Sequence, residues 1–215
     1  MKTRIDHDVI ITGEVLTLNG VLGIPPNPSG VVLFAHGSGS GRLSPRNTFV
    51  ARQLQEHGLA TLLLDLLTAD EAEDRQNVFD INLLADRLLL ANAWLGRGAR
   101  TMGLPIGLFG ASTGAGAALQ AAARNPSKVH AVVSRGGRPD LAEAYLSSVT
   151  APTLLIVGGN DDPVVKMNQS AYERLTCEKH MIIVPGATHL FEEPGALEQV
   201  AEEANRWFLR FLAEA

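Results

Sequence analysis

The sequence predicts an open, doubly wound α/β sheet, and three observations predict it. Short runs of β-branched and aliphatic residues recur along the chain. Between them lie segments whose apolar residues recur at intervals of three and four, which is the spacing of amphipathic helices. The chain also opens on an alternating apolar and polar stretch, which is typical of an antiparallel strand pair. Together they favour a mostly parallel sheet with helices on both faces and an antiparallel start.

The first strands are expected in "HDVIITGEVLTLNGVLGIP", with a hairpin turn at Asn19-Gly20. The later apolar runs are nearly solid, as strands covered on both faces must be, and parallel strands are the usual members of that class. We expect such strands at 30–37, 59–67, 104–112, 129–137, 152–159 and 180–189.

The segments between these runs are expected to be helices, and the last shows a clear apolar stripe that includes Val200, Trp207 and Phe211. The acidic segment "TADEAEDRQN", residues 68–77, follows a predicted strand and could border the pocket, but we favour a solvated loop. The expected helices are 46–57, 78–97, 113–125, 139–148, 163–175 and 194–213.

Composition limits the classes of function. A chain of 215 residues with 46% hydrophobic residues can bury one full core, so we expect a single domain over residues 1–215. The net charge of −5 provides no positive field for a phosphate backbone or an anionic membrane, so neither nucleic acid nor membrane is an expected partner. Nothing in the sequence indicates an oligomeric state.

The cellular compartment is inferred from what the chain lacks. The N-terminal stretch has scattered charges and no apolar run of signal-peptide length, and no later run reaches the length of a membrane span. The lone cysteine, Cys177, cannot form an intramolecular disulfide and is interpreted as a packing residue. The cytoplasm is the expected location.

A serine between two glycines stands where a predicted strand runs directly into a predicted helix. The stretch "GASTG" places Ser112 between Gly110 and Gly114 in a G-x-S-x-G pattern. A tight strand-to-helix turn strains the serine backbone, and side chains two residues away on either side would collide with the neighbouring chain. The turn would expose the Ser112 hydroxyl beside the positive end of the helix. The bland alternative is a glycine-rich turn with a buried serine.

A serine hydroxyl becomes a nucleophile only when a base accepts its proton and an acid orients that base. His189 stands at the end of the last predicted strand, at the same edge of the sheet as Ser112, whereas His130 and His180 stand near the beginnings of strands, at the opposite edge. Asp161 and Asp162 follow the strand before it, and either could orient the imidazole or cap the next helix. We favour Asp161 for the imidazole and Asp162 for the cap.

A developing oxyanion needs backbone N–H donors, and the loop "AHGSGSGRLSPRN" is rich in glycine. We assign the two donors to the N–H groups of Ser38 and Thr113, and we expect Gly37 to let the loop approach a substrate. His36 is interpreted as a brace for this loop and not as the base. The alternative is an ordinary flexible loop.

The motifs "HGSGSG", "GASTG", "GGNDDPV" and "GATHLFEEPG", in that order, resemble the α/β-hydrolase superfamily and its small, lidless dienelactone-hydrolase-like members. The resemblance covers nearly the whole chain. It implies Ser112 as nucleophile, His189 as base and Asp161 as acid, because a G-x-x-D-x-x-V pattern falls on Gly158, Asp161 and Val164. Dienelactone hydrolases proper use a cysteine nucleophile, whereas this chain has Ser112, so the resemblance does not predict the substrate. The segment between the strands ending at 137 and beginning at 152 is too short for a helical lid domain.

Three arginines are candidate substrate-binding residues because a fork of guanidinium donors suits a carboxylate. Arg135 and Arg138 follow a strand at the active edge, and Arg46 begins the helix after the oxyanion loop. The alternative is that they pair on the surface with Asp140 or Glu143.

The expected reaction is acyl transfer to water from a small soluble ester or lactone, through an acyl-enzyme on Ser112. No metal ion or organic cofactor is needed. An acyltransferase or an amidase or peptidase would use the same three residues, since the substrate pocket decides between them. A non-catalytic anion-binding module is the alternative from another class, although it would have no use for His189.

Overall fold

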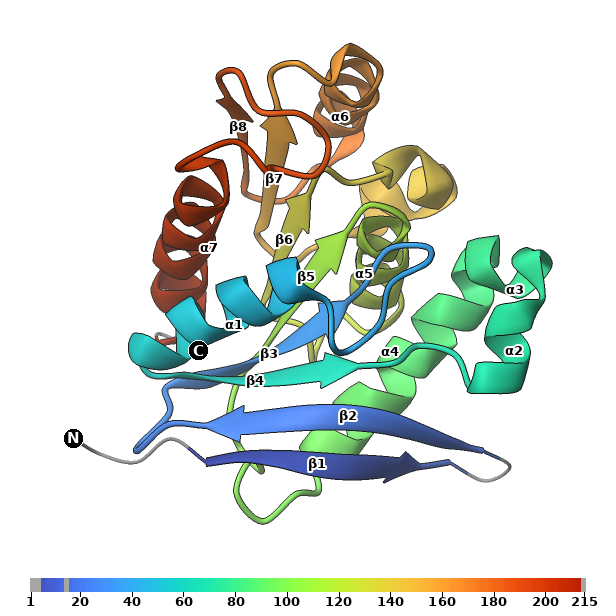
Figure 1. Cartoon of the computed structure of the whole chain (residues 1–215), viewed down its shortest axis with the longest axis vertical. Coiled ribbons are helices and arrows are strands. Elements are labelled where there is room, and N and C mark those ends of the chain that lie inside the picture. The colour runs from blue at the N-terminus through green and yellow to red at the C-terminus, as the bar shows by residue number, and fades with distance from the viewer. Residues whose placement is uncertain (1–4, 14–15, 214–215) are drawn as a thin grey trace.

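The computed structural model describes residues 5–13 and 16–213, and it contains one eight-stranded sheet (Figure 1). The strand order is β1-β2-β4-β3-β5-β6-β7-β8. The first strand pairs antiparallel with the second and the second with the fourth, whereas all the remaining neighbours are parallel. The strands are β1 (Ile5–Thr12), β2 (Thr17–Ile24), β3 (Gly30–Ala35), β4 (Leu59–Leu64), β5 (Ile106–Ala111), β6 (Ala131–Arg135), β7 (Thr153–Gly158) and β8 (Lys179–Val184).

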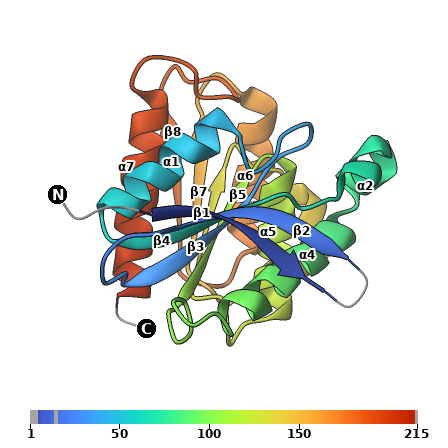
Figure 2. The ribbon, with the colours of Figure 1, turned by 60° about the horizontal axis from the view of Figure 1, so that its bottom comes forward.

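Helices cover both faces of the sheet, which confirms the doubly wound arrangement (Figure 2). The α1 and α7 helices pack on one face around Phe109 and Phe208, and α4, α5, α6 and the 3-10 helix η1 lie on the other, around Leu33 and Leu108. The helices are α1 (Pro45–Glu56), α2 (Ala69–Glu73), α3 (Arg75–Phe79), α4 (Ile81–Leu95), α5 (Thr113–Arg124), η1 (Pro139–Ser148), α6 (Asp162–Arg174) and α7 (Ala196–Leu212).

The predicted hairpin turn at Asn19-Gly20 is wrong. These two residues lie inside β2, where Gly20 pairs with Val9 of β1 and with Leu64 of β4. The chain reverses between Thr12 and Thr17, and Gly13 N–H donates to the Leu16 carbonyl at 2.9 Å. The position of Gly20 between two strands and close to the side chains of Leu62 and Ile11 explains the glycine better than a turn does.

The predicted loop at 68–77 and helix at 78–97 are replaced by three helices. A polar side chain caps the N-terminus of each helix. Thr68 forms a capping box with Glu71 at α2, Asp74 caps α3, and Asp80 caps α4. These helix boundaries are set by polar capping residues and not by the spacing of apolar residues. A prediction from apolar spacing alone therefore gave one helix at 78–97 and a loop at 68–77.

The strands at the centre of the sheet are fully buried, as their apolar sequences predict, but β8 differs. It has a neighbour on one side only, and most of its residues are partly or fully exposed, including Ile183. Among the described residues, no helix combines the length and the apolar character that crossing a bilayer requires.

Candidate active site

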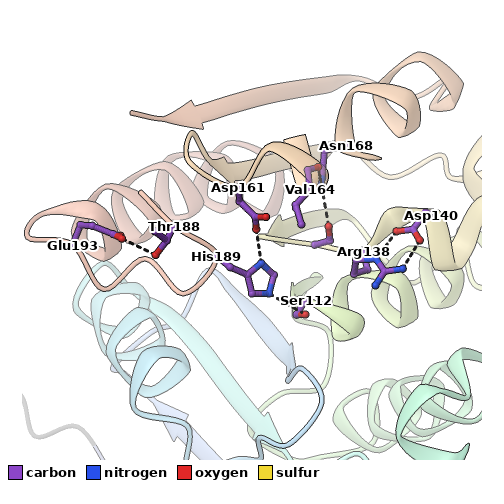
Figure 3. Close-up of polar contacts among 10 residues, drawn as sticks. Ser112, Arg138, Asp140, Asp161, Val164, Asn168, Thr188, His189 and Glu193 are labelled. Atoms are coloured by element: carbon purple, nitrogen blue, oxygen red, sulfur yellow. Dashed lines mark hydrogen bonds and ion pairs between the residues drawn. The ribbon is translucent and has the colours of Figure 1, made fainter. Parts of the chain in front are cut away.

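The carboxyl ends of β5, β7 and β8 bring together three side chains that the sequence singled out (Figure 3). His189 Nδ1 lies 2.7 Å from Asp161 Oδ2, and His189 Nε2 lies 3.3 Å from Ser112 Oγ. An ionised carboxylate only accepts hydrogen bonds, so the Nδ1 proton is donated to Asp161 and Nε2 is left to accept the serine proton. The arrangement can deprotonate the Ser112 hydroxyl.

Ser112 occupies the turn between β5 and α5 with φ +52°, a left-handed conformation that costs a non-glycine residue strain. The flanking glycines make the turn possible: a Cβ at Gly110 would overlap the backbone of Ala115, and one at Gly114 would overlap the carbonyl of Ala35. Backbone contacts fix the serine further, because its N–H donates to the Arg135 carbonyl at 3.2 Å and its carbonyl accepts from Arg138 N–H at 3.0 Å. The turn is the one expected for an exposed nucleophile.

Loop contacts place His189 beside the serine. The Asn160 N–H donates to the Ala187 carbonyl at 2.9 Å, which ties the loop after β8 to the loop after β7 that carries Asp161. Thr188 Oγ1 donates to Glu193 Oε1 at 2.6 Å, across the next turn of the same loop (Figure 3). Gly136 lies against the imidazole, since an added Cβ would stand 3.5 Å from Nδ1.

The two aspartates divide their roles differently from the prediction in one respect. Asp161, and not Asp162, occupies the N-cap position of α6, but its side chain makes no capping hydrogen bond and faces His189 instead. Asp162 is the first residue inside the helix, where a negative charge is favoured by the helix dipole without being a cap. The pairing of Asp161 with His189 is as predicted, and the capping role of Asp162 is wrong.

The loop after β3 lies directly against the serine. A Cβ at Gly37 would stand 3.0 Å from Ser112 Cβ, and Ser38 N–H donates to Thr113 Oγ1 at 3.0 Å. His36 braces the loop as predicted: Leu66 N–H donates to its Nε2 at 3.0 Å, so the proton on Nδ1 is available to the Gly37 carbonyl at 3.0 Å. Burial lowers the pKa of His36, although Gly37 and Asp65 oppose that shift. The ring is therefore neutral at pH 7.

The three candidate arginines do not form one group of donors for a substrate carboxylate. Arg138 pairs with Asp140 through two hydrogen bonds of 2.9 and 2.7 Å, the surface pairing that was the alternative, and this contact raises its pKa. Arg46 pairs with Glu192 at 3.1 Å.

Arg135 is different, because its side chain is only 6% exposed and its Nε and Nη1 have no partner among the described residues. Its guanidinium lies 5.8 Å from the centre of the Phe191 ring. Burial, with the nearby charge of Arg46, lowers the Arg135 pKa to about 10, so the group is still a cation at neutral pH.

A cavity of about 420 Å³ opens beside the loop after β3, and the sequence did not locate its apolar lining. Its lining includes Ser38 and Thr113 on one side and residues of α2 and α3 on the other. The acidic segment 68–77, for which a solvated loop was the favoured interpretation, thus contributes to the wall of this cavity, as the alternative held. The T-x-x-E pattern of Thr68 and Glu71 is a helix-start signal that could have revealed it.

Cys177 lies near the opposite end of β7, where its Sγ is 3.7 Å from Thr153 Oγ1, and burial raises its pKa. A thiol with a raised pKa is a poor nucleophile, which agrees with a packing role. Within the described ranges, no group of three or more histidine, cysteine and acidic residues is arranged to hold a metal ion.

Comparison with known proteins gives the family. The family described as PET hydrolase-like matches residues 98–215, more than half of the chain. A dienelactone hydrolase from Anabaena variabilis has a crystal structure that is 55% identical, covers 97% of this chain and 99% of its own, and superposes with a TM-score of 0.94. A lidless serine hydrolase from Xanthomonas campestris is 20% identical over 96% of this chain and 95% of its own, with a TM-score of 0.78, and shows the shared fold.

A curated protein of Mycobacterium tuberculosis strain H37Rv, named "Putative phosphoribosyl transferase", is 55% identical over 207 residues. The match covers 96% of this chain and 47% of that protein, so the chain spans about half the length of the curated relatives it matches. Both the family match and the near full-length match to a solved structure point the same way as the strand order and the serine turn. The chain belongs to the PET hydrolase-like family of α/β hydrolases, among its dienelactone-hydrolase-like members without a lid.

Proposed function

We propose that this chain is a serine hydrolase that cleaves small carboxylic esters or lactones through an acyl-enzyme on Ser112. One observation carries the proposal: a serine on a strained turn is within hydrogen-bond reach of an imidazole whose other nitrogen is held by a carboxylate. His189 accepts the Ser112 proton as the oxygen attacks the carbonyl carbon, and then delivers it to the leaving alcohol. Water, deprotonated by the same imidazole, releases the acid.

The oxyanion of each tetrahedral intermediate is assigned to the N–H groups of Thr113 and Ser38. Thr113 is the first residue of α5, so its N–H has no acceptor within the helix and lies at the positive end of the dipole. The Ser38 N–H donates to the Thr113 hydroxyl, and rotation of that side chain would release it to a substrate oxygen. Each donor of this kind lowers the barrier by about 3 kcal/mol.

We propose that Arg135 binds a negatively charged group of the substrate, rather than Arg138 or Arg46, which is paired with Glu192. Arg138 is already satisfied by Asp140, whereas Arg135 holds a buried positive charge with two free donor nitrogens. Gly37 contributes by its lack of a side chain, which keeps the entrance above Ser112 open.

The phosphoribosyl transferase name does not change the proposal. More than half of the relatives with that name lies outside the match, and we assign that activity to the part this chain does not cover. Acyl transfer to another acceptor and amide cleavage use the same three residues, so the substrate panel must include them.

The test is labelling with a fluorophosphonate probe, followed by assays of p-nitrophenyl esters, small lactones and matching amides. Wild type is expected to be labelled and to hydrolyse esters or lactones fastest. Ser112→Ala should lose both properties. Ser148→Ala, which removes an exposed hydroxyl far from His189, is the matched control and should keep both. Labelling of Ser112→Ala would mean that another residue reacts, which would overturn the assignment of Ser112 as nucleophile. No labelling of wild type, together with stabilisation by small anions, would favour the anion-binding module.

A further inference from the structure

The cavity beside the oxyanion loop is apolar on the side of α2 and α3. Leu67, Ala69, Ala72, Val78 and Leu84 line this wall, and they present no charged group to the space. Ser112 is not among the described lining residues, but Gly37 and Thr113 are, and both adjoin it. Thr113 follows Ser112 in the chain, and a Cβ at Gly37 would stand 3.7 Å from Ser112 Oγ. The volume of about 420 Å³ falls within the range of small-molecule sites. A group bound to Ser112 that passes Gly37 and Thr113 would enter apolar surroundings.

The charged residues of the cavity neutralise each other. Arg42 and Asp65 form an ion pair, and the Arg42 backbone N–H also donates to Asp65 Oδ1 at 2.7 Å. Arg42 Nε has no partner in the described chain, but it is shielded from solvent. The cavity thus differs from the surroundings of Arg135, where a positive charge is unpaired, and it favours a neutral occupant.

The position of His189 decides which half of an ester enters the cavity. Among the described residues, neither Ser112 nor His189 lines it, whereas Ser38 and Thr113, whose N–H groups are the assigned oxyanion donors, do. His189 must protonate the leaving oxygen, so the alcohol half has to lie on the imidazole side of Ser112. The acyl half then points away from His189, past the oxyanion donors.

We propose that this cavity is an acyl-group site which selects neutral, apolar acyl chains such as hexanoyl or phenylacetyl, with Ala72 and Val78 setting its size. The proposal rests on the hydrolase function proposed above and names the substrate class of that same site. It assigns a selecting role to α2 and α3, the two short helices inserted between β4 and α4.

The wall is well enough fixed to select by shape. Glu71 of α2 joins the elements behind the wall: its carboxylate accepts from Thr68 N–H at 2.9 Å and pairs with Arg87 of α4 at 2.6 Å. Its carbonyl accepts from Asn77 Nδ2 at 3.0 Å, which joins α2 to α3. If a larger group fills the cavity, α2 and α3 cannot move aside without breaking those contacts.

The test narrows the cavity and compares two substrate series. Val78→Trp and Ala72→Phe each add volume at the wall, and Gln76→Trp adds the same bulk to an exposed position of α3 that does not line it. One series varies the acyl group of p-nitrophenyl esters from acetate to hexanoate and phenylacetate. The other keeps the acetyl group and varies the alcohol. Fluorophosphonate titration gives the concentration of active protein, and thermal unfolding shows that each variant is folded.

We expect Val78→Trp and Ala72→Phe to lower the ratio of kcat/KM for hexanoate to kcat/KM for acetate by about tenfold or more, since even one methylene in a pocket changes kcat/KM by about 10-fold or more. Gln76→Trp should leave the ratio as in wild type. A change confined to the alcohol series, or no change in either, would overturn the acyl site while the labelling still supports the hydrolase. Absence of labelling in wild type would instead overturn the proposed function itself.

Discussion

The site has two sides that are built by different means. On one side, Ser112, Asp161 and His189 follow strand ends, and backbone hydrogen bonds such as that from Asn160 to Ala187 set their positions. On the other side, α2 and α3 are short helices held by the side chains of Thr68, Asp74 and Asp80 and by the Glu71–Arg87 pair. On the proposed function, the difference teaches that the reaction and its selectivity are separable: sheet topology sets the first, and a few polar side chains on α2, α3 and α4 set the second.

The largest effect on activity is expected from Asp161→Asn, among the residues that follow the strand ends. An amide in this place stabilises the wrong imidazole tautomer, and kcat should fall by about 10⁴-fold while the fold is kept. The measurement is the kcat for p-nitrophenyl acetate together with a thermal unfolding curve. Asp162→Asn makes the same exchange one residue later, inside α6, and should keep most of the activity. A larger loss in Asp162→Asn would reverse the assignment of the two residues.

The next effect tests the turn itself. In Gly114→Ala the new methyl group would meet the carbonyl oxygens of Ala35 and His36, which belong to the backbone and cannot move aside cheaply. We expect a loss of about 3 kcal/mol in the free energy of unfolding, measured by denaturant titration. Gly96→Ala is the control, since its nearest atoms would be 3.7 Å away, and its stability should change by less than about 1 kcal/mol. Equal losses in both variants would contradict the tight turn.

On the helical side, the effects should be smaller and local. Asp80 accepts from Leu83 N–H at 3.0 Å where α3 ends and α4 begins. Its replacement by alanine should cost about 1 kcal/mol of unfolding free energy, whereas Asp80→Asn keeps an acceptor and should cost less. Chemical denaturation measures both. If the two variants were equally destabilised, charge and not capping would hold this junction.

The smallest expected effect is a pH dependence of the stabilisation that Glu71 provides to α2. Burial by itself would raise the pKa of Glu71, but the Thr68 N–H and the Arg87 charge outweigh it and lower the pKa below the usual 4.5. The stabilisation from this carboxylate is therefore complete above pH 4.5 and is lost as the pH falls toward the lower folded-state pKa. Solvent screening keeps it within about 1 kcal/mol.

The measurement is the difference in unfolding free energy between wild type and Glu71→Gln across this acid range. The difference should shrink as the pH falls, and Glu73→Gln, an exposed neighbour, should show no such trend. A difference that grew on acidification would contradict the direction of the shift.

Sequence reasoning predicted what depends on apolar patterning and strand order. Solid apolar runs located the central strands, and the position at a strand end was enough to select His189. The same position left Asp161 and Asp162 open, and the G-x-x-D-x-x-V resemblance supported the choice of Asp161. The prediction of helix boundaries failed where a polar side chain caps a helix, as at Asp74 and Asp80. A cap starts a new helix in a new direction without altering the spacing of the apolar residues. Sequence reasoning failed also for Arg135, since whether a guanidinium is paired on the surface or buried alone depends on tertiary neighbours such as Phe191.

The exposed position of β8 has a consequence for how the protein loses activity. Ser112 is carried by a strand in the middle of the sheet, but the imidazole is carried by the loop that leaves the outermost strand, which has a single neighbour to hold it. Edges with few buried contacts open at lower cost than the centre of a fold does. On warming, catalysis should therefore cease, reversibly, at a temperature where the rest of the sheet is still intact.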